Sequence, residues 1–96
     1  MLAALYGKAM IDSKYKVKRY ITEFFEETEE LIAEYDLGGF DLSKFQKEFN
    51  EPNAENPMLD CYPIKSENIS FLKKYIDVEP EWNFVNKSYF VEAHGI

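Results

Sequence analysis

The chain has 96 residues, a formal net charge of −7 at neutral pH, and 46% hydrophobic and 17% aromatic residues. This length fits one domain, and the apolar content supports a folded core rather than whole-chain disorder. The single cysteine excludes an intrachain disulfide framework, and no apolar run approaches the ~20 residues that a membrane-spanning helix needs. We therefore expect one cytoplasmic domain over residues 1–96 without a membrane partner.

Residues 1–13 precede the first strongly patterned segment of the chain. The apolar stretch Met1–Tyr6 is short and has no basic region before it, which argues against a signal peptide. We expect residues 1–13 to form an N-terminal arm outside the core fold. Alternatively, residues 1–9 form a short helix or strand that covers an apolar patch or a second subunit, so a homodimer is compatible with the sequence.

Residues 14–25 are rich in β-branched and aromatic side chains and predict a strand. The alternation places Tyr15, Val17 and Ile21 on one face and Lys16, Lys18, Tyr20 and Thr22 on the other. We expect the basic stretch Lys14–Arg19 to lie on the outward face of this strand, where lysines discourage edge-to-edge pairing.

Residues 30–37 predict a second strand, with residues 26–29 as the connecting turn. The competing interpretation makes residues 22–36 one amphipathic helix, because Phe24, Thr28, Leu31 and Tyr35 fall at helical spacing. We prefer the hairpin, since the preceding segment is strongly β and Gly38-Gly39 ends the pattern abruptly.

Two helices are predicted further along the chain. Asp41 is a suitable N-cap for a helix over residues 42–50, with Leu42, Phe45 and Phe49 on one face. Ser66 would cap a second helix over residues 67–76, with Ile69, Leu72 and Ile76 on one stripe. The turn-rich loop 50–57 cannot form a regular element.

Extended segments follow at residues 58–64, 82–85 and 88–93. The element order is then β-β-α-(β)-α-β. This order predicts an α+β fold, in which a small antiparallel sheet of three to four strands carries two helices on one face.

The acidic residues are unevenly distributed. Between residues 23 and 36 the chain has no lysine or arginine but seven acidic residues, namely Glu23, Glu26, Glu27, Glu29, Glu30, Glu34 and Asp36. Concentrated negative charge repels nucleic acid and anionic membranes, and it attracts basic proteins at a distance. We therefore predict a basic protein partner and take Glu26, Glu27, Glu29 and Glu30 as contact residues.

The chain has few groups suited to catalysis. Its one cysteine, Cys61, and its one histidine, His94, fit a buried small residue and a solvated tail residue better than a nucleophile and its base. Gly38-Gly39 is typical of a turn rather than a phosphate-binding loop. We expect no catalytic residues, no metal and no cofactor.

Two alternatives stay open. The clustered carboxylates could serve a small cytosolic enzyme or bind a divalent cation. The Lys14–Arg19 strand, with aromatic side chains interleaved, could bind nucleic acid, although the adjacent acidic block would oppose the phosphates.

Residues 56–64 contain two prolines that fix the backbone at both ends. We expect a rigid connection that places Met58 and Tyr62 in the core. Alternatively, the segment is a pre-ordered contact loop. Glu55 and Asp60 would then contact the basic partner, and Trp82 is a further candidate partner-binding residue.

The segments Phe25–Leu31, Pro57–Ile64 and Tyr89–Ala93 together resemble small acidic bacterial proteins of the immunity type, as found in contact-dependent inhibition and other polymorphic toxin systems. The resemblance covers residues 14–93. It implies a cytosolic inhibitor that binds the C-terminal domain of a toxin, often a nuclease. Occlusion of the toxin's active site by an acidic surface would be its mechanism.

Overall fold

The computed structural model describes residues 17–95, so the expected N-terminal arm over residues 1–13 lies outside the described residues. The elements, in chain order, are β1 (Val17–Phe25), β2 (Leu31–Asp36), α2 (Leu42–Glu48), β3 (Tyr62–Pro63), the 3₁₀ helix η1 (Ser66–Asn68), α3 (Ile69–Leu72) and β4 (Lys87–Gly95). This order confirms the predicted α+β fold. Within the described part of the chain, no helix is long and apolar enough to cross a membrane.

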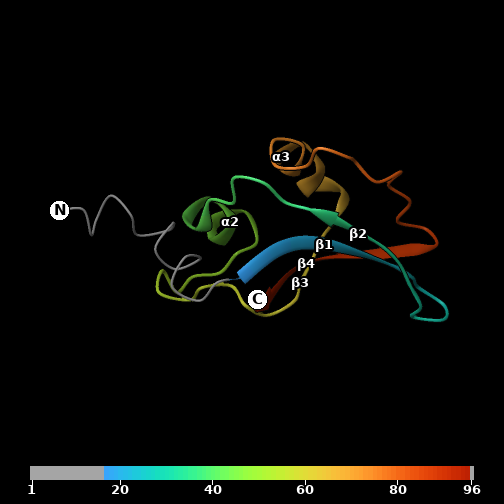
Figure 1. Cartoon of the computed structure of the whole chain (residues 1–96), viewed down its shortest axis with the longest axis horizontal. Coiled ribbons are helices and arrows are strands. Elements are labelled where there is room, and N and C mark those ends of the chain that lie inside the picture. The colour runs from blue at the N-terminus through green and yellow to red at the C-terminus, as the bar shows by residue number, and fades with distance from the viewer. Residues whose placement is uncertain (1–16, 96) are drawn as a thin grey trace.

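The strands form one four-stranded sheet in the order β2-β1-β4-β3, with every neighbouring pair antiparallel. The hairpin between β1 and β2 is confirmed, and its register pairs Ile21 with Tyr35 and Glu23 with Ala33. The pairing shifts between Glu23 and Phe24, where β2 carries an extra residue. The two longest strands, β1 and β4, lie side by side at the centre of the sheet (Figure 1).

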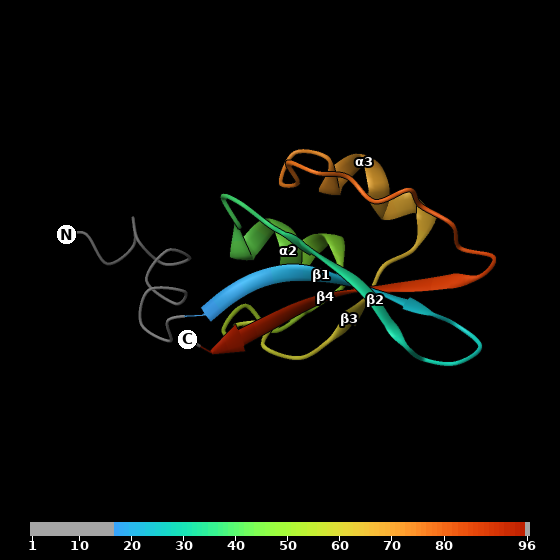
Figure 2. The same ribbon diagram turned by 45° about the vertical axis from the view of Figure 1, so that its right-hand side comes forward.

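Both helices lie on the same side of the sheet, as Figures 1 and 2 show. From the sheet, Ile21, Tyr89 and Val91 point into this layer and are almost completely buried. They meet Leu42, Phe45 and Leu72 from the helices and Met58 and Ile64 from the connecting segments. Burial of one such side chain stabilises the fold by about 1.5–3 kcal/mol, which makes this layer the main source of stability.

Helix α2 begins as predicted. The side chain of Asp41 caps it by accepting a hydrogen bond of 3.3 Å from the Lys44 backbone N–H. Leu42 and Phe45 are buried and Phe49 packs against the same core, so the predicted apolar face is confirmed. The helix ends at Glu48 because Asn50 adopts a positive φ of 60°, which a continuing helix does not allow.

The predicted helix over residues 67–76 is much shorter in the structure. The chain forms η1 and then the four-residue α3, and Ser66 is the first residue of η1 rather than its N-cap. Ile76 instead forms an antiparallel bridge with Leu37, and the Tyr75 carbonyl accepts a hydrogen bond from the Gly38 N–H. Pairing with the end of β2 therefore replaces the expected last turns of the helix.

The predicted strand over residues 82–85 is also wrong. The side-chain oxygen of Asn83 accepts hydrogen bonds from the backbone N–H groups of Val85 and Asn86, at 3.0 and 3.2 Å. This arrangement folds residues 84–86 into a turn that leads directly into β4. The strand then starts at Lys87 and runs to Gly95, longer than the predicted residues 88–93.

The predicted outward position of Arg19 is wrong, since only 4% of its surface is exposed. Arg19 has the same strand parity as Ile21, so it points toward the helices. Its guanidinium donates hydrogen bonds to the carbonyls of Met58 (2.6 Å) and Pro57 (2.8 Å) and lies 4.1 Å from the Phe40 ring centroid. Lys18 does point outward and forms an ion pair with Asp36 at 3.2 Å.

The proline-bracketed segment 56–64 is a tightly held connection, as expected. Met58 is buried, Tyr62 is half-buried, and the Tyr62 hydroxyl donates a 2.9 Å hydrogen bond to Glu51. The predicted burial of Cys61 is wrong, because this residue is exposed at the edge of the sheet next to β3.

Candidate protein-binding surface

The turn between β1 and β2 presents four carboxylates to solvent. Glu26, Glu27, Glu29 and Glu30 are all exposed, as predicted for contact residues. The backbone holds the turn in place, because the Glu29 N–H donates to the Phe25 carbonyl (2.8 Å) and the Glu26 N–H donates to the Asn86 carbonyl (2.9 Å). Like charges thus stay close together on a fixed frame.

Apolar side chains lie among these carboxylates. Phe25 is 42% exposed, Leu31 48% and Val85 85%. Phe25 and Val85 line a shallow hollow of about 590 Å³ together with Glu26, Glu27 and Glu30. The β1–β2 turn and the segment leading into β4 lie at the same end of the molecule, as Figure 2 shows, and this brings Phe25 and Val85 to one hollow. We call this surface, formed by residues 25–31 with Val85, the acidic hairpin end.

A buried carboxylate lies behind the acidic hairpin end. Glu23, assigned to the acidic block by sequence, is only 2% exposed because it shares the strand face of Ile21. It accepts hydrogen bonds from the hydroxyls of Tyr35 (2.7 Å) and Tyr89 (3.1 Å) and forms an ion pair with Lys87 (3.1 Å). Burial alone would raise the pKa of Glu23, but the bonds from Tyr35, Lys87 and Tyr89 outweigh it and lower the pKa.

The same network alters its tyrosines. Burial and the hydrogen bond to Glu23 raise the pKa of Tyr35 to about 12. Burial also raises the pKa of Tyr89, whose hydroxyl accepts a 3.0 Å hydrogen bond from the Asn83 N–H. Both hydroxyls thus stay protonated and continue to donate to the Glu23 carboxylate at neutral pH.

Trp82 lies in a cleft next to this network. The cleft has a volume of about 700 Å³, and its lining includes Glu23, Tyr35, Trp82, Phe84 and Lys87. Its lining also includes Val85, which belongs to the acidic hairpin end. The structure therefore brings the predicted contact residue Trp82 to the same end of the molecule as the exposed glutamates.

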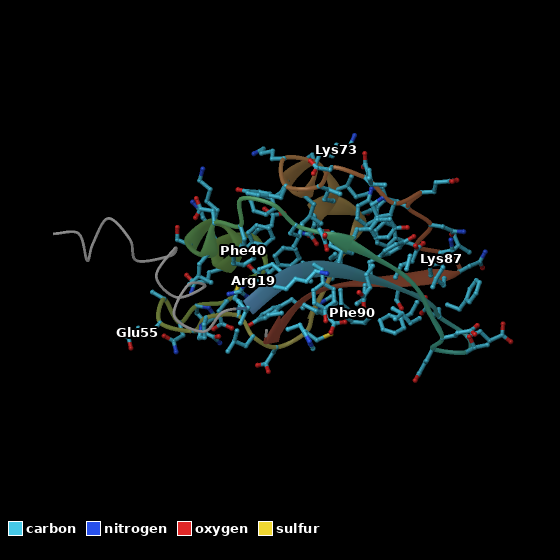
Figure 3. All side chains as sticks on the ribbon, viewed as in Figure 1. Arg19, Phe40, Glu55, Lys73, Lys87 and Phe90 are labelled. Atoms are coloured by element: carbon cyan, nitrogen blue, oxygen red, sulfur yellow. The ribbon has the colours of Figure 1, made fainter. Side chains whose placement is uncertain are left out.

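Two other predicted contact residues lie elsewhere. Glu55 is at the opposite end of the molecule from Lys87, which starts β4 beside the hairpin end (Figure 3). Asp60 precedes β3 at the far edge of the sheet from β2. The predicted contact residues thus do not form one surface: Glu26, Glu27, Glu29, Glu30 and Trp82 lie at the hairpin end, Glu55 lies at the opposite end, and Asp60 lies at the β3 edge of the sheet.

The face of the sheet that points away from the helices carries the edge-to-face ring pair of Phe24 and Phe90, with centroids 6.0 Å apart. Phe90 appears on this side in Figure 3. The Thr22 hydroxyl donates a 2.6 Å hydrogen bond to Glu92 on the same face. Partial burial, with the charges of Glu92 and Asp60, raises the pKa of the Cys61 thiol, which opposes thiolate formation.

Sequence reasoning missed the Glu23 network. The available signal was the alternation of side chains along β1. Arg19, Ile21 and Glu23 are two positions apart, so their side chains point to the same face. Their partners could not be read from the same pattern, since Tyr89 is 66 positions away from Glu23. Within residues 17–95, no cluster of histidine, cysteine or acidic side chains is arranged to hold a metal ion.

Comparison with known proteins links these elements to one family. No curated protein matches the chain. A family described as a domain of unknown function, DUF7683, matches residues 18–92. The matched range starts at the second residue of β1 and extends into β4, so it includes the hairpin, both helices and the Trp82 cleft. The chain belongs to the DUF7683 family.

Proposed function

We propose that the protein binds and neutralises a basic partner protein through the acidic hairpin end. The observation that carries this proposal is that the exposed side chains of Phe25 and Val85 share one hollow with exposed carboxylates. Protein-binding surfaces commonly combine an apolar centre with a polar rim. Phe25 and Val85 supply the centre, and Glu26, Glu27 and Glu30 supply the rim.

The charges and the apolar groups have different roles in this proposal. Exposed carboxylates act at a distance, because they orient a basic partner and speed the encounter by up to about 10³-fold at low salt. Their contribution to affinity is small in water. Desolvation of Phe25 and Val85 in the complex would provide the contact that slows dissociation.

The partner we propose is a toxin domain whose active site carries lysine and arginine residues, with a nuclease as the leading example. The acidic hairpin end would occupy the site where substrate phosphates bind and thereby exclude the substrate. In this role the protein is an immunity-type inhibitor that acts in the cytoplasm and has no enzymatic activity of its own. The sequence resemblance to immunity-type proteins supports the same role.

On this proposal we predict that a gene next to this one encodes a large toxin, and the experiment uses the product of that gene. The C-terminal toxin domain is expressed from an inducible promoter, with or without the parent protein, and growth is measured. We expect growth to stop without the protein and to continue with it. The purified pair should also migrate as one complex in size-exclusion chromatography.

A matched pair of variants distinguishes the effect of the acidic hairpin end from the effect of the overall negative charge. The hairpin variant carries Glu26→Lys, Glu27→Lys and Glu30→Lys, and the control carries Glu55→Lys, Glu67→Lys and Asp77→Lys at other exposed positions. Each set of three reversals adds six charges and changes the net charge from −7 to −1. Protection should be lost only in the hairpin variant. Equal protection by both variants would refute the proposed surface.

A further inference from the structure

The Trp82 cleft has two walls of different chemistry. One wall is the edge strand β2, which contributes Ile32, Ala33 and Tyr35, and the other is the segment 81–85. Glu23 and Lys87 also line the cleft. In Figure 3, the labelled Lys87 lies where β4 begins, beneath the segment that forms the second wall. The cleft is thus formed by the rigid sheet and by a segment fixed through the Asn83 turn.

The cleft carries more negative than positive charge. Lys87 already forms an ion pair with Glu23 at 3.1 Å, so these two opposite charges neutralise each other. Glu81 is exposed, and within the described part of the chain its carboxylate has no ion-pair partner. Glu79 does not line the cleft, but its carboxylate accepts a 2.7 Å hydrogen bond from the Trp82 indole N–H. A cation that enters the cleft would therefore meet an uncompensated carboxylate at Glu81.

Aromatic rings form the rest of the second wall. The rings of Trp82 and Phe84 are nearly parallel, with an interplanar angle of 3° and centroids 5.8 Å apart. Both are only half-buried, so part of their ring surface remains in contact with solvent. The negative face of an aromatic ring attracts cations, most strongly at tryptophan. A planar guanidinium has the additional advantage that it stacks on such rings while it donates to a carboxylate in two places.

We propose that this cleft binds an arginine side chain of the basic partner, with the guanidinium between Glu81 and the Trp82–Phe84 rings. The inference rests on the proposed function only in taking the partner as the source of the arginine. The cleft adjoins the acidic hairpin end through Val85, so both surfaces can meet one partner at the same time. The hairpin end would attract the partner, and the arginine would fix its register.

The experiment needs no partner protein. N-acetyl-arginine methylamide is titrated into the ¹⁵N-labelled full chain, and the indole N–H signal is followed by NMR. The chain has one tryptophan, so this signal reports on Trp82 alone. The citrulline analogue has nearly the same shape without the charge, and the lysine analogue has the charge without the plane. We expect a saturable shift with arginine, a weaker affinity for lysine and no binding of citrulline.

Two substitutions test the role of Glu81. Glu81→Gln should weaken arginine binding about two- to fivefold, as expected for an exposed ion pair. The matched control Glu67→Gln removes another exposed carboxylate outside the cleft and should leave binding unchanged. Citrulline binding as tight as arginine binding, or an equal effect of the two substitutions, would overturn the proposal. Equal affinity for lysine would overturn the choice of arginine.

The outcome is independent of the test for the proposed function. Absence of any saturable shift would refute the arginine site while leaving the hairpin surface untouched. Arginine binding in a protein whose hairpin variant still protects cells would keep the cleft and refute the hairpin surface.

Discussion

The hydroxyl of Tyr35 lies 2.7 Å from the carboxylate of Glu23, so a hydrogen bond joins an edge strand to the centre of the sheet. Tyr35 pairs with Ile21 in the register, which makes Glu23 its diagonal neighbour on the same face. Tyr89 and Lys87 approach the same carboxylate from β4. Glu23 therefore links three strands directly beneath the Trp82 cleft.

Replacement of Glu23 by glutamine should destabilise the protein in a pH-dependent manner. Because the folded-state pKa of Glu23 lies below its ordinary value of 4.5, the ionised carboxylate stabilises the fold above about pH 4.5. This contribution is lost as the pH falls through the folded-state pKa. We expect Glu23→Gln to lower the free energy of unfolding by about 1–3 kcal/mol at pH 7, with a smaller difference in acid. Urea unfolding at several pH values measures both quantities.

The matched control is Glu67→Gln, which changes an exposed carboxylate. Its unfolding free energy should follow the parent protein at every pH. A loss of stability in Glu23→Gln that is the same at pH 3 and pH 7 would contradict the role of the ionised carboxylate.

Arg19 should contribute more to the free energy of unfolding than an exposed charged residue does. Arg19→Met keeps an apolar stem against Phe40 but leaves the carbonyls of Pro57 and Met58 without their donors. Two charge-assisted hydrogen bonds in a buried position predict a loss of about 2–4 kcal/mol. The control Lys18→Met removes an exposed ion pair with Asp36 and should cost less than about 1 kcal/mol. Similar midpoints in urea for the two variants would contradict this assignment.

Strand periodicity predicted β1 and β2 well, because local alternation and the Gly38-Gly39 signal agree there. The same alternation puts Arg19 on the inward face of β1 with Ile21. We nevertheless predicted an outward position for it, because a charged side chain is usually exposed. The structure shows why the charge is tolerated: the carbonyls that accept from it lie 38 and 39 positions away. Such long-range partners leave no signature in the local pattern.

The end of the second helix and the shape of the cleft also depend on long-range contacts that the local sequence pattern does not show. The stripe of Ile69 and Leu72 was recognised, but the end of the helix is set by the bridge between Leu37 and Ile76. Trp82 was recognised as a candidate contact residue without its cleft, because the cleft requires the Asn83 turn and the edge of β2 together. Exposure of Glu26 and Glu27 followed from composition alone.

Cys61 should be nearly dispensable for stability. The residue is exposed, so Cys61→Ala should change the free energy of unfolding by less than about 0.5 kcal/mol. The raised pKa of its thiol reduces the thiolate fraction at neutral pH, so alkylation by iodoacetamide should be slower than that of a cysteine in a short peptide. Alkylation faster than the peptide standard would reveal an activated thiol and revive the enzymatic alternative.

The most direct test of the central claim is an association rate. The rate is that at which the acidic hairpin end binds the toxin domain encoded by the adjacent gene. Stopped-flow measurements on the parent, the hairpin variant and the matched control variant are made at about 20 mM and about 500 mM salt, which span weak to strong screening. We predict that the hairpin variant associates at least about tenfold more slowly than the control variant at low salt. The difference should largely disappear at high salt, with melting temperatures unchanged. Equal association rates for the two variants at low salt would contradict the account.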